Sequence, residues 1–218
     1  ELIDIFKKES PQILHTHLFY PNYFGRMAAI FYRKIPMVII TEHGTKSSFK
    51  KFYHFWADFL LNFFTSKIIA VSSAVKEYIV KSSFISDKKI TVIYNGIDFD
   101  KFDCVSGKDK QSVRKEIGLP ESGILIGCVS TLAPWKGQLY LFKAFKDIVK
   151  IFPFAKLCIV GRDTGEFRKE LESYAREHDF IGSVHFLGER RDIPNILRAL
   201  DLFVFPSLTE GLGISLIQ

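Results

Sequence analysis

The chain has 218 residues, of which 47% are hydrophobic and 25% charged, so it is long enough for one large or two small folded domains and is not a disordered segment. Its net charge of +6 fits phosphate-bearing substrates or an anionic membrane, but solvated lysines explain it equally well, and we expect no nucleic-acid partner. Aromatic residues make up 15%, with 22 phenylalanines, which indicates large packed surfaces or an apolar ligand or membrane face.

The three cysteines, Cys104, Cys128 and Cys158, are an odd number without metal-ligand spacing. We expect them to be reduced packing residues of a cytosolic protein. No apolar run is long enough to span a membrane, because Asn62 and Lys67 interrupt the longest candidate.

The first residue is not Met, and the chain opens inside a predicted helix over residues 2–8. It ends just as another helix begins, at about Ile214. We therefore expect an internal piece of a longer protein, whose targeting signals cannot be judged from this stretch.

From Pro11 on, short apolar runs alternate with longer helical patterns, which is typical of a parallel sheet covered by helices. In the first half, strands are predicted at 13–17, 37–41, 68–71 and 90–94, and helices at 22–33, 49–64 and 74–81. This part is expected to form one domain, residues 1–100.

A polar stretch rich in Asp, Lys, Ser and Gly follows, and residues 101–122 are predicted to be a linker. The same rhythm restarts in residues 123–218, with strands at 124–130, 155–160, 183–187 and 202–205, and helices at 137–151, 166–178, 192–199 and from 214. The predicted fold class is α/β, with two Rossmann-like, doubly wound parallel-sheet domains and a cleft between them.

The predicted helix Phe49–Phe64 has a polar stripe at helical spacing, formed by Lys50, Lys51, His54, Asp58 and Asn62. Aromatic and aliphatic residues cover the rest of it, a wider apolar arc than packing on one sheet requires. Two interpretations stay open: a core helix, or docking to a membrane or to another part of the protein.

Open α/β sheets bind ligands at the carboxyl ends of their strands, so His15, His17, Glu42 and His43 fall where chemistry is expected. For any one of these histidines, a strand-end residue that only makes a hydrogen bond is the alternative.

Two loops of the second half carry groups suited to phosphate. Lys136 precedes a glycine at a predicted helix start, and residues 210–213 supply a carboxylate and two glycines whose backbone N–H groups can approach a ligand. Together they could hold a diphosphate and stabilise the charge of a leaving phosphate. An ordinary strand–loop–helix link is the alternative for residues 205–218 taken alone, and no His/Cys cluster has zinc-ligand spacing.

Several short motifs follow one another along nearly the whole chain: IYNGID at 93–98, LAPWKGQ at 132–138, IVG at 159–161, VHFLG at 184–188 and ALDLFVFPS at 199–207, leading into Glu210-Gly211. In order and spacing they resemble the retaining, nucleotide-sugar-dependent glycosyltransferases of the GT-B fold, glycosyltransferase family 4 (the glycosyl transferases group 1 type). The resemblance implies an N-terminal acceptor-side domain that is incomplete at its start and a donor-binding domain that is incomplete at its end.

The resemblance also implies roles for single residues. Lys136 corresponds to the lysine that binds the donor diphosphate, and Glu210 to the first glutamate of the family's Glu-x7-Glu motif beside the reacting carbon. His43 matches the histidine that reaches the sugar from the first domain. Further donor-binding positions are Thr131, Arg190 in the loop 188–191, and Gly211, Leu212, Gly213, Ile214, Ser215 and Gln218. The family works without an obligatory metal, so no cofactor is expected.

Two positions depart from the family pattern. Thr131 stands where many members have an arginine on the diphosphate, and Gln218 stands at the second acidic position, so both lose a charge. The predicted function is a hexosyltransferase acting on a glycan, lipid or other hydroxyl acceptor in cell-surface polysaccharide or glycolipid synthesis, in the cytoplasm or at the inner face of the membrane. The alternatives are a nucleotide-sugar-binding protein without catalysis and, less supported, a related epimerase or phosphorylase.

Overall fold

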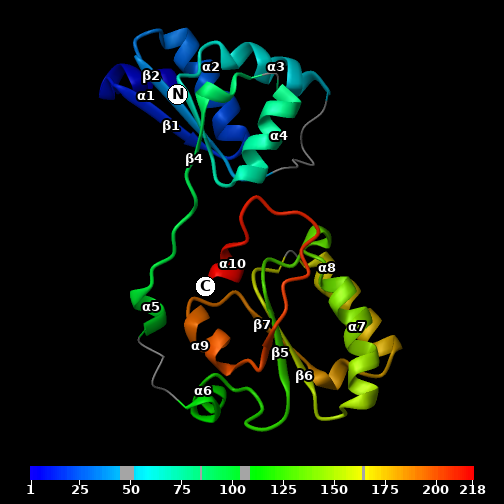
Figure 1. The fold of residues 1–218 in the computed structure, drawn as a ribbon. Helices are drawn as coiled ribbons and strands as arrows, with labels where there is room; N and C mark the ends of the chain where they lie inside the picture. Colours follow the sequence, from blue (N-terminus) through cyan, green and yellow to red (C-terminus); the bar gives the residue numbers. More distant parts are fainter. Residues whose placement is uncertain (45–51, 84, 104–108, 164) are drawn as a thin grey trace. The chain divides into compact units, whose positions relative to one another are not determined.

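Each half of the chain builds its own four-stranded sheet, and within each sheet every pair of neighbouring strands is parallel. The computed structural model describes residues 1–44, 52–83, 85–103, 109–163 and 165–218. Contacts divide the chain into two units, one of Glu1–Gly96 with Thr209–Gly213 and one of Ile97–Leu208 with Ile214–Gln218. The predicted α/β class with two parallel sheets is confirmed (Figure 1).

The first unit has the strand order β1-β2-β3-β4, with β1 at Ile13–His17, β2 at Met37–Glu42, β3 at Lys67–Ala70 and β4 at Ile90–Val92. Its helices are α1 (Leu2–Glu9), α2 (Phe19–Tyr32), α3 (Phe52–Asn62) and α4 (Ser73–Ser83), with a short 3-10 turn, η1, at Asp87–Lys89. The core beneath α4 joins Ile40, Ile68 and Ile90 of three strands to Val75 and Ile79.

Helix α2 begins at Phe19, three residues before the predicted start at 22. The sequence pattern placed the start after Pro21, but proline is tolerated in the first turn of a helix, where its missing N–H would have no partner. The helix ends at Tyr32, and Arg33 follows with a left-handed backbone, φ 58°.

The second unit has the strand order β7-β6-β5-β8, formed by β5 (Leu125–Val129), β6 (Lys156–Val160), β7 (Val184–Gly188) and β8 (Leu202–Phe203). Its helices are α5 (Asp100–Asp103), α6 (Lys110–Glu116), α7 (Gln138–Ile151), α8 (Glu166–Glu177), α9 (Ile193–Ala199) and α10 (Ile214–Ile217), with 3-10 turns η2 (Pro134–Lys136) and η3 (Ile181–Ser183).

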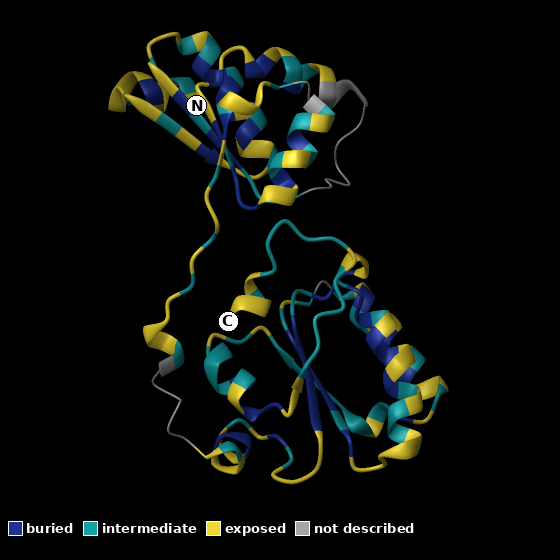
Figure 2. Cartoon of the chain, viewed as in Figure 1, coloured by how far each residue is buried: buried dark blue, intermediate teal, exposed yellow. Residues whose placement is uncertain are grey.

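Helices cover both faces of this second sheet, which is why its central strands read as continuous apolar runs. Ile126 and Leu157 point towards α7 and α8, whereas their neighbours Leu125 and Cys158 point towards α6 and α9. Figure 2 shows β5 and β6 in the colour of buried residues.

The polar stripe of α3 turns inward. Asp58 and Asn62 are buried, whereas Trp56, Leu60 and Phe63 on the apolar arc are exposed. The reason is Arg26 of α2, only 2% exposed, which donates to Asp58 at 2.5 Å and to Asn62 at 3.0 Å. The residues Lys50 and Lys51 of the predicted stripe lie outside the described residues, as does the side chain of His54.

Two of the three cysteines, Cys128 and Cys158, are free and buried, and burial raises the pKa of both thiols, for Cys158 to about 12. Cys104 lies outside the described residues. Within the part of the chain that the structure describes, no helix is both long and apolar enough to cross a membrane.

The predicted linker at 101–122 contains α6, whose Val113 is fully buried against the second sheet. Arg114 ties this helix down: Nε donates to the Ala199 carbonyl at 2.8 Å, Nη1 to the Gly123 carbonyl at 3.0 Å and Nη2 to Asp201 at 2.5 Å. The polarity that indicated a linker belongs partly to these inward-facing contacts.

The carboxylate of Asp201 makes the second unit sensitive to acid. Burial by itself raises its pKa, but hydrogen bonds from Lys110, from the Leu125 N–H and from Arg114 outweigh burial and lower the pKa from 3.8 to about 2. A lowered carboxylate pKa stabilises the fold above the unfolded value, so this contribution is present above about pH 4 and is lost as the pH falls towards about 2.

We therefore expect the difference in unfolding free energy between the wild type and Asp201→Asn to be largest near neutral pH and to shrink between about pH 4 and 2. Urea unfolding at several pH values measures it. A difference that does not change with pH would contradict this account.

Candidate functional site

The strand order of the second sheet has a switch point, and the candidate site residues follow the strands on either side of it. In chain order the strands run 3-2-1-4, so the order reverses between β5 and β8. Ligands of open α/β sheets bind outside the carboxyl ends of the strands at such a switch point. The loop after β5 carries Thr131 and Lys136, and the segment after β8 leads to Glu210.

Backbone contacts hold three of these strand-end loops together. Ser130 N–H donates to the Val160 carbonyl at 2.9 Å, Leu132 N–H to the Arg162 carbonyl at 3.0 Å, and Gly161 N–H to the Gly188 carbonyl at 2.8 Å. A Cβ at Gly161 would lie 2.0 Å from the Ser130 oxygen, so only glycine fits there. The loops after β5, β6 and β7 therefore form one connected edge.

Lys136 is the last residue of η2 and stands directly before α7. Gly137 has φ 72°, and a Cβ on it would lie 2.0 Å from the carbonyl oxygen of Pro206, so the loop after β8 packs against the start of α7. The Leu208 N–H also donates to the Trp135 carbonyl at 3.0 Å. The loop that carries the half-buried Lys136 is thus fixed against the loop after β8, at the switch point.

Gln138 is a residue of this site that sequence reasoning missed. It is fully buried, and its Nε2 donates to Ser130 Oγ and to the Thr131 carbonyl, each at 2.9 Å. An amide in the first turn of an otherwise amphipathic helix is the only sequence signal for it. The side chain fixes the loop that carries Thr131 and Lys136.

Replacing Gln138 by leucine is expected to lower the unfolding free energy of the second unit by about 1–3 kcal/mol, because Ser130 Oγ and the Thr131 carbonyl lose the two hydrogen bonds that the buried Gln138 Nε2 donates. Hydrogen exchange of the amides at 130–136 should also accelerate. The matched control is Lys150→Ala at the exposed far end of α7. Equal exchange in the two variants would show that Gln138 does not hold the loop.

Arg190, predicted to bind the donor, follows β7 and forms a bidentate ion pair with Asp192, with Nε–Oδ1 2.8 Å and Nη2–Oδ2 2.7 Å. The hydrogen bond to Asp192 raises the pKa of Arg190, and the same bond lowers the pKa of Asp192. The pair orients the guanidinium, and its remaining N–H groups are available for a ligand.

The segment that carries Glu210 is Thr209–Gly213, which the contacts assign to the first unit. Within that unit, Leu212 packs on the core formed by Ile68 and Val75, and a Cβ at Gly211 would lie 2.0 Å from the His43 carbonyl oxygen. Ile214 and Ser215 open α10, a single turn, and Gln218 is exposed after it. The helix predicted from 214 is therefore present with four residues.

His43 follows β2 and lies beside the two histidines of β1. His17 Nδ1 is 3.1 Å from His43 Nε2, and His15 Nε2 is 2.8 Å from Thr41 Oγ1. Burial, and then the charge of His17, lower the pKa of His43, which favours the neutral imidazole. All four strand-end positions singled out by sequence, His15, His17, Glu42 and His43, thus lie in the first unit.

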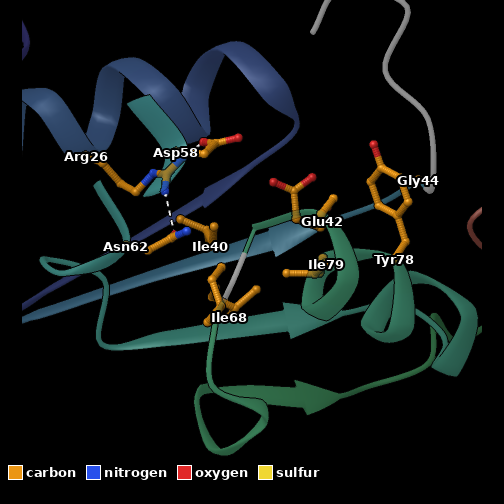
Figure 3. Close-up of a pocket in the computed structure, with 11 residues that line it drawn as sticks. Arg26, Ile40, Glu42, Gly44, Asp58, Asn62, Ile68, Tyr78 and Ile79 are labelled. Carbon is orange, nitrogen blue, oxygen red and sulfur yellow. Dashed lines mark hydrogen bonds and ion pairs between the residues drawn. The ribbon is translucent and has the colours of Figure 1, made fainter. Parts of the chain in front are cut away.

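A small cavity lies behind this strand end. It measures about 30 Å³ and is lined by the Arg26–Asp58–Asn62 network, Glu42 and Tyr78 (Figure 3). A space of this size holds about one water molecule, so it cannot take a sugar or a nucleotide. No three His, Cys, Asp or Glu residues within the described ranges are grouped so that they could bind a metal ion.

Comparison with known proteins agrees with this arrangement. The family model described as "Glycosyl transferases group 1" matches residues 109–218, and "Glycosyltransferase Family 4" matches residues 1–101. The Escherichia coli UDP-Gal:alpha-D-GlcNAc-diphosphoundecaprenol alpha-1,3-galactosyltransferase is 33% identical over 100% of this chain and 57% of its own length. The Staphylococcus aureus capsular polysaccharide biosynthesis glycosyltransferase CapM is 29% identical over 98% of this chain and 57% of its own.

Among solved structures, Anabaena HepE in complex with UDP-glucose aligns with a TM-score of 0.81 at 25% identity over 94% of this chain and 55% of that one. The sucrose-phosphate synthase of Thermosynechococcus elongatus aligns with a TM-score of 0.78 at 18% identity, which shows the fold alone. The chain spans about half the length of these relatives.

Two α/β units, each with a parallel four-stranded sheet, and the likeness to HepE define an α/β protein of the GT-B glycosyltransferase fold. With a family model matched over half of its length and a 33% identical relative over all of it, the chain belongs to the glycosyl transferases group 1 family.

Proposed function

We propose that this chain is part of a retaining hexosyltransferase that moves a sugar from a nucleotide diphospho-sugar to a hydroxyl of a glycan, lipid or other acceptor. The observation that carries the proposal is the match over the whole chain to a galactosyltransferase whose name specifies a UDP-sugar donor and a diphosphoundecaprenol-linked acceptor. CapM supports a role in cell-surface polysaccharide or glycolipid synthesis.

In this proposal the bond between the sugar's anomeric carbon and the diphosphate breaks, and the acceptor oxygen bonds to the same face of the sugar. The acceptor's proton passes to the departing diphosphate. Lys136 neutralises the charge that develops on this leaving group, aided by backbone N–H groups of 211–215 and by the Thr131 hydroxyl. Glu210 and His43 contact the donor sugar, and Arg190 and Gln218 contact the nucleoside.

Lys136 in this role takes over the charge neutralisation that a metal would otherwise supply, so we propose that no bound metal is required. A chelator should then leave transfer unchanged, and a rate that collapses with EDTA and returns with Mg²⁺ would overturn this part.

The second candidate is a protein that binds nucleotide-sugars without transferring them. Thr131 and Gln218 favour it, because each lacks the charge that the family pattern has at its position. The two candidates share the binding step and differ only in turnover.

A calorimetric titration of the chain with UDP-, GDP- and ADP-sugars tests the shared step, and transfer to a lipid-linked or soluble sugar acceptor, measured in the protein with its native flanking sequence, tests turnover. Saturable binding with turnover that falls in Glu210→Ala supports the transferase. Binding without turnover supports the second candidate, and no binding of any of the three donors rules out both.

We further propose a cytoplasmic location with peripheral association at the inner face of the membrane. The apolar arc of α3 supports it, with Trp56 61%, Leu60 60% and Phe63 68% exposed. Co-sedimentation with anionic vesicles tests it: the triple variant Trp56→Ser/Leu60→Ser/Phe63→Ser should remain in the supernatant, whereas equal sedimentation of variant and wild type would exclude this face.

A further inference from the structure

Three histidines of the first unit form a row at the carboxyl ends of β1 and β2. The rings of His15 and His17 lie 4.3 Å apart between centroids, and those of His17 and His43 lie 5.4 Å apart. His15 and His17 are two residues apart in β1, so their side chains lie on the same face of the sheet. No motif of the family resemblance includes His17.

The contact between His17 and His43 joins one specific nitrogen of each ring. A neutral imidazole has one N–H donor and one acceptor nitrogen, so a hydrogen bond between His17 Nδ1 and His43 Nε2 requires one of them to carry the proton and the other to lack it. If His17 Nδ1 carries a proton, His43 must be protonated on Nδ1, and if His17 Nδ1 lacks one, His43 must be protonated on Nε2. In either arrangement His43 Nε2 is engaged, and Nδ1 is the ring nitrogen left for a ligand.

Neighbouring groups limit how the ring of His17 can move. The ring lies against that of His15 at an interplanar angle of 37°, and His15 Nε2 is 2.8 Å from Thr41 Oγ1. Thr41 is buried in β2, and its carbonyl accepts from Asn22 Nδ2 at 3.1 Å. A continuous set of contacts thus runs from the buried Asn22 through Thr41 and His15 to His17.

We propose that His17 is a positioning residue for His43: through the Nδ1–Nε2 hydrogen bond it sets the ring orientation and the protonated nitrogen that His43 presents to the donor sugar. This rests on the proposed function, in which His43 contacts the sugar. His17 itself touches no substrate in this scheme, since it acts through the adjacent ring.

Imidazole ¹⁵N spectra of the labelled chain test the hydrogen bond without any assay of activity, because they distinguish the two neutral tautomers of each histidine. In the wild type, His43 should show a single tautomer. In His17→Ala it should show the average of both, and in His17→Asn, whose amide can donate to or accept from Nε2, the hydrogen-bonded shift of Nε2 should return. His178→Gln in the second unit is the control and should leave the His43 signals unchanged. Identical His43 shifts in the wild type and His17→Ala would overturn the proposal.

Transfer kinetics then test the consequence. His17→Ala should lower kcat about 10-fold, with the KM for the donor within about 2-fold, since the sugar still binds but meets a misoriented imidazole. His17→Asn should recover most of the loss. An unchanged kcat in His17→Ala would overturn the positioning role. If the wild type transfers no sugar, the proposed function fails, while the spectra still decide whether His17 fixes His43.

Discussion

Lys136→Ala is expected to lower the rate of sugar transfer about 10²–10³-fold, the cost of removing one preorganised group from a developing negative charge. The loss should appear mainly in kcat, because the charge on the leaving diphosphate grows between the ground state and the transition state. The side chain is well placed for this, since Gly137 and Trp135 hold its backbone between the loops after β5 and β8.

The control for this substitution is Lys150→Ala, which removes an exposed lysine from the other end of α7 and should keep the wild-type rate. Steady-state kinetics with a saturating donor give the comparison. A Lys136→Ala variant with wild-type kcat would remove the lysine from the proposed mechanism.

Asp58→Ala is expected to lower the unfolding free energy of the first unit by about 3–5 kcal/mol, because it leaves the buried Arg26 guanidinium without a counter-charge. Arg26 is 2% exposed, and the one water molecule that the adjoining cavity of about 30 Å³ could hold carries no charge to replace the carboxylate. Asn62 and the Asn22 carbonyl still accept from Arg26 but carry no charge.

Urea unfolding followed by tryptophan fluorescence measures this effect, because Trp56 lies in the first unit and Trp135 in the second, and Trp135→Phe leaves a probe of the first unit alone. Replacing both ions, Arg26→Leu with Asp58→Leu, should cost much less than Asp58→Ala, since no charge is then stranded. A double variant as unstable as the single one would mean that shape, and not charge, governs this site.

The order of strands and helices could be predicted from the sequence because it depends on local periodicity. The predicted strand at 13–17 has the bounds observed for β1, and most other elements differ by one to three residues. Strand β8 is shorter than the apolar run that predicted it, because only Leu202 and Phe203 pair with β5. Likewise, Lys136 before Gly137 was recognisable because a glycine at a helix start is a local signal.

Contacts between distant parts of the chain could not be predicted in the same way. The sequence showed Asp58 and Asn62 as a polar stripe but not their partner, Arg26, which lies 32 residues from Asp58. Residues 101–122 were predicted to be a linker from a stretch rich in Asp, Lys, Ser and Gly, whereas Arg114 and Lys110 contact Asp201, which lies 87 and 91 residues away. Gln138 was missed for the same reason, as was the contact between His17 and His43.

Periodicity, glycine placement and the order of short motifs are thus enough to predict the α/β class, the two sheets and the glycosyl transferases group 1 family. Each of these signals can be recognised in short stretches of neighbouring residues, without knowing which distant residues come into contact. The tertiary structure alone decides which polar groups are buried and which histidine nitrogen is engaged. Burying a charge or an amide is favourable only when a partner from another segment meets it, and the position of that partner is a property of the folded chain.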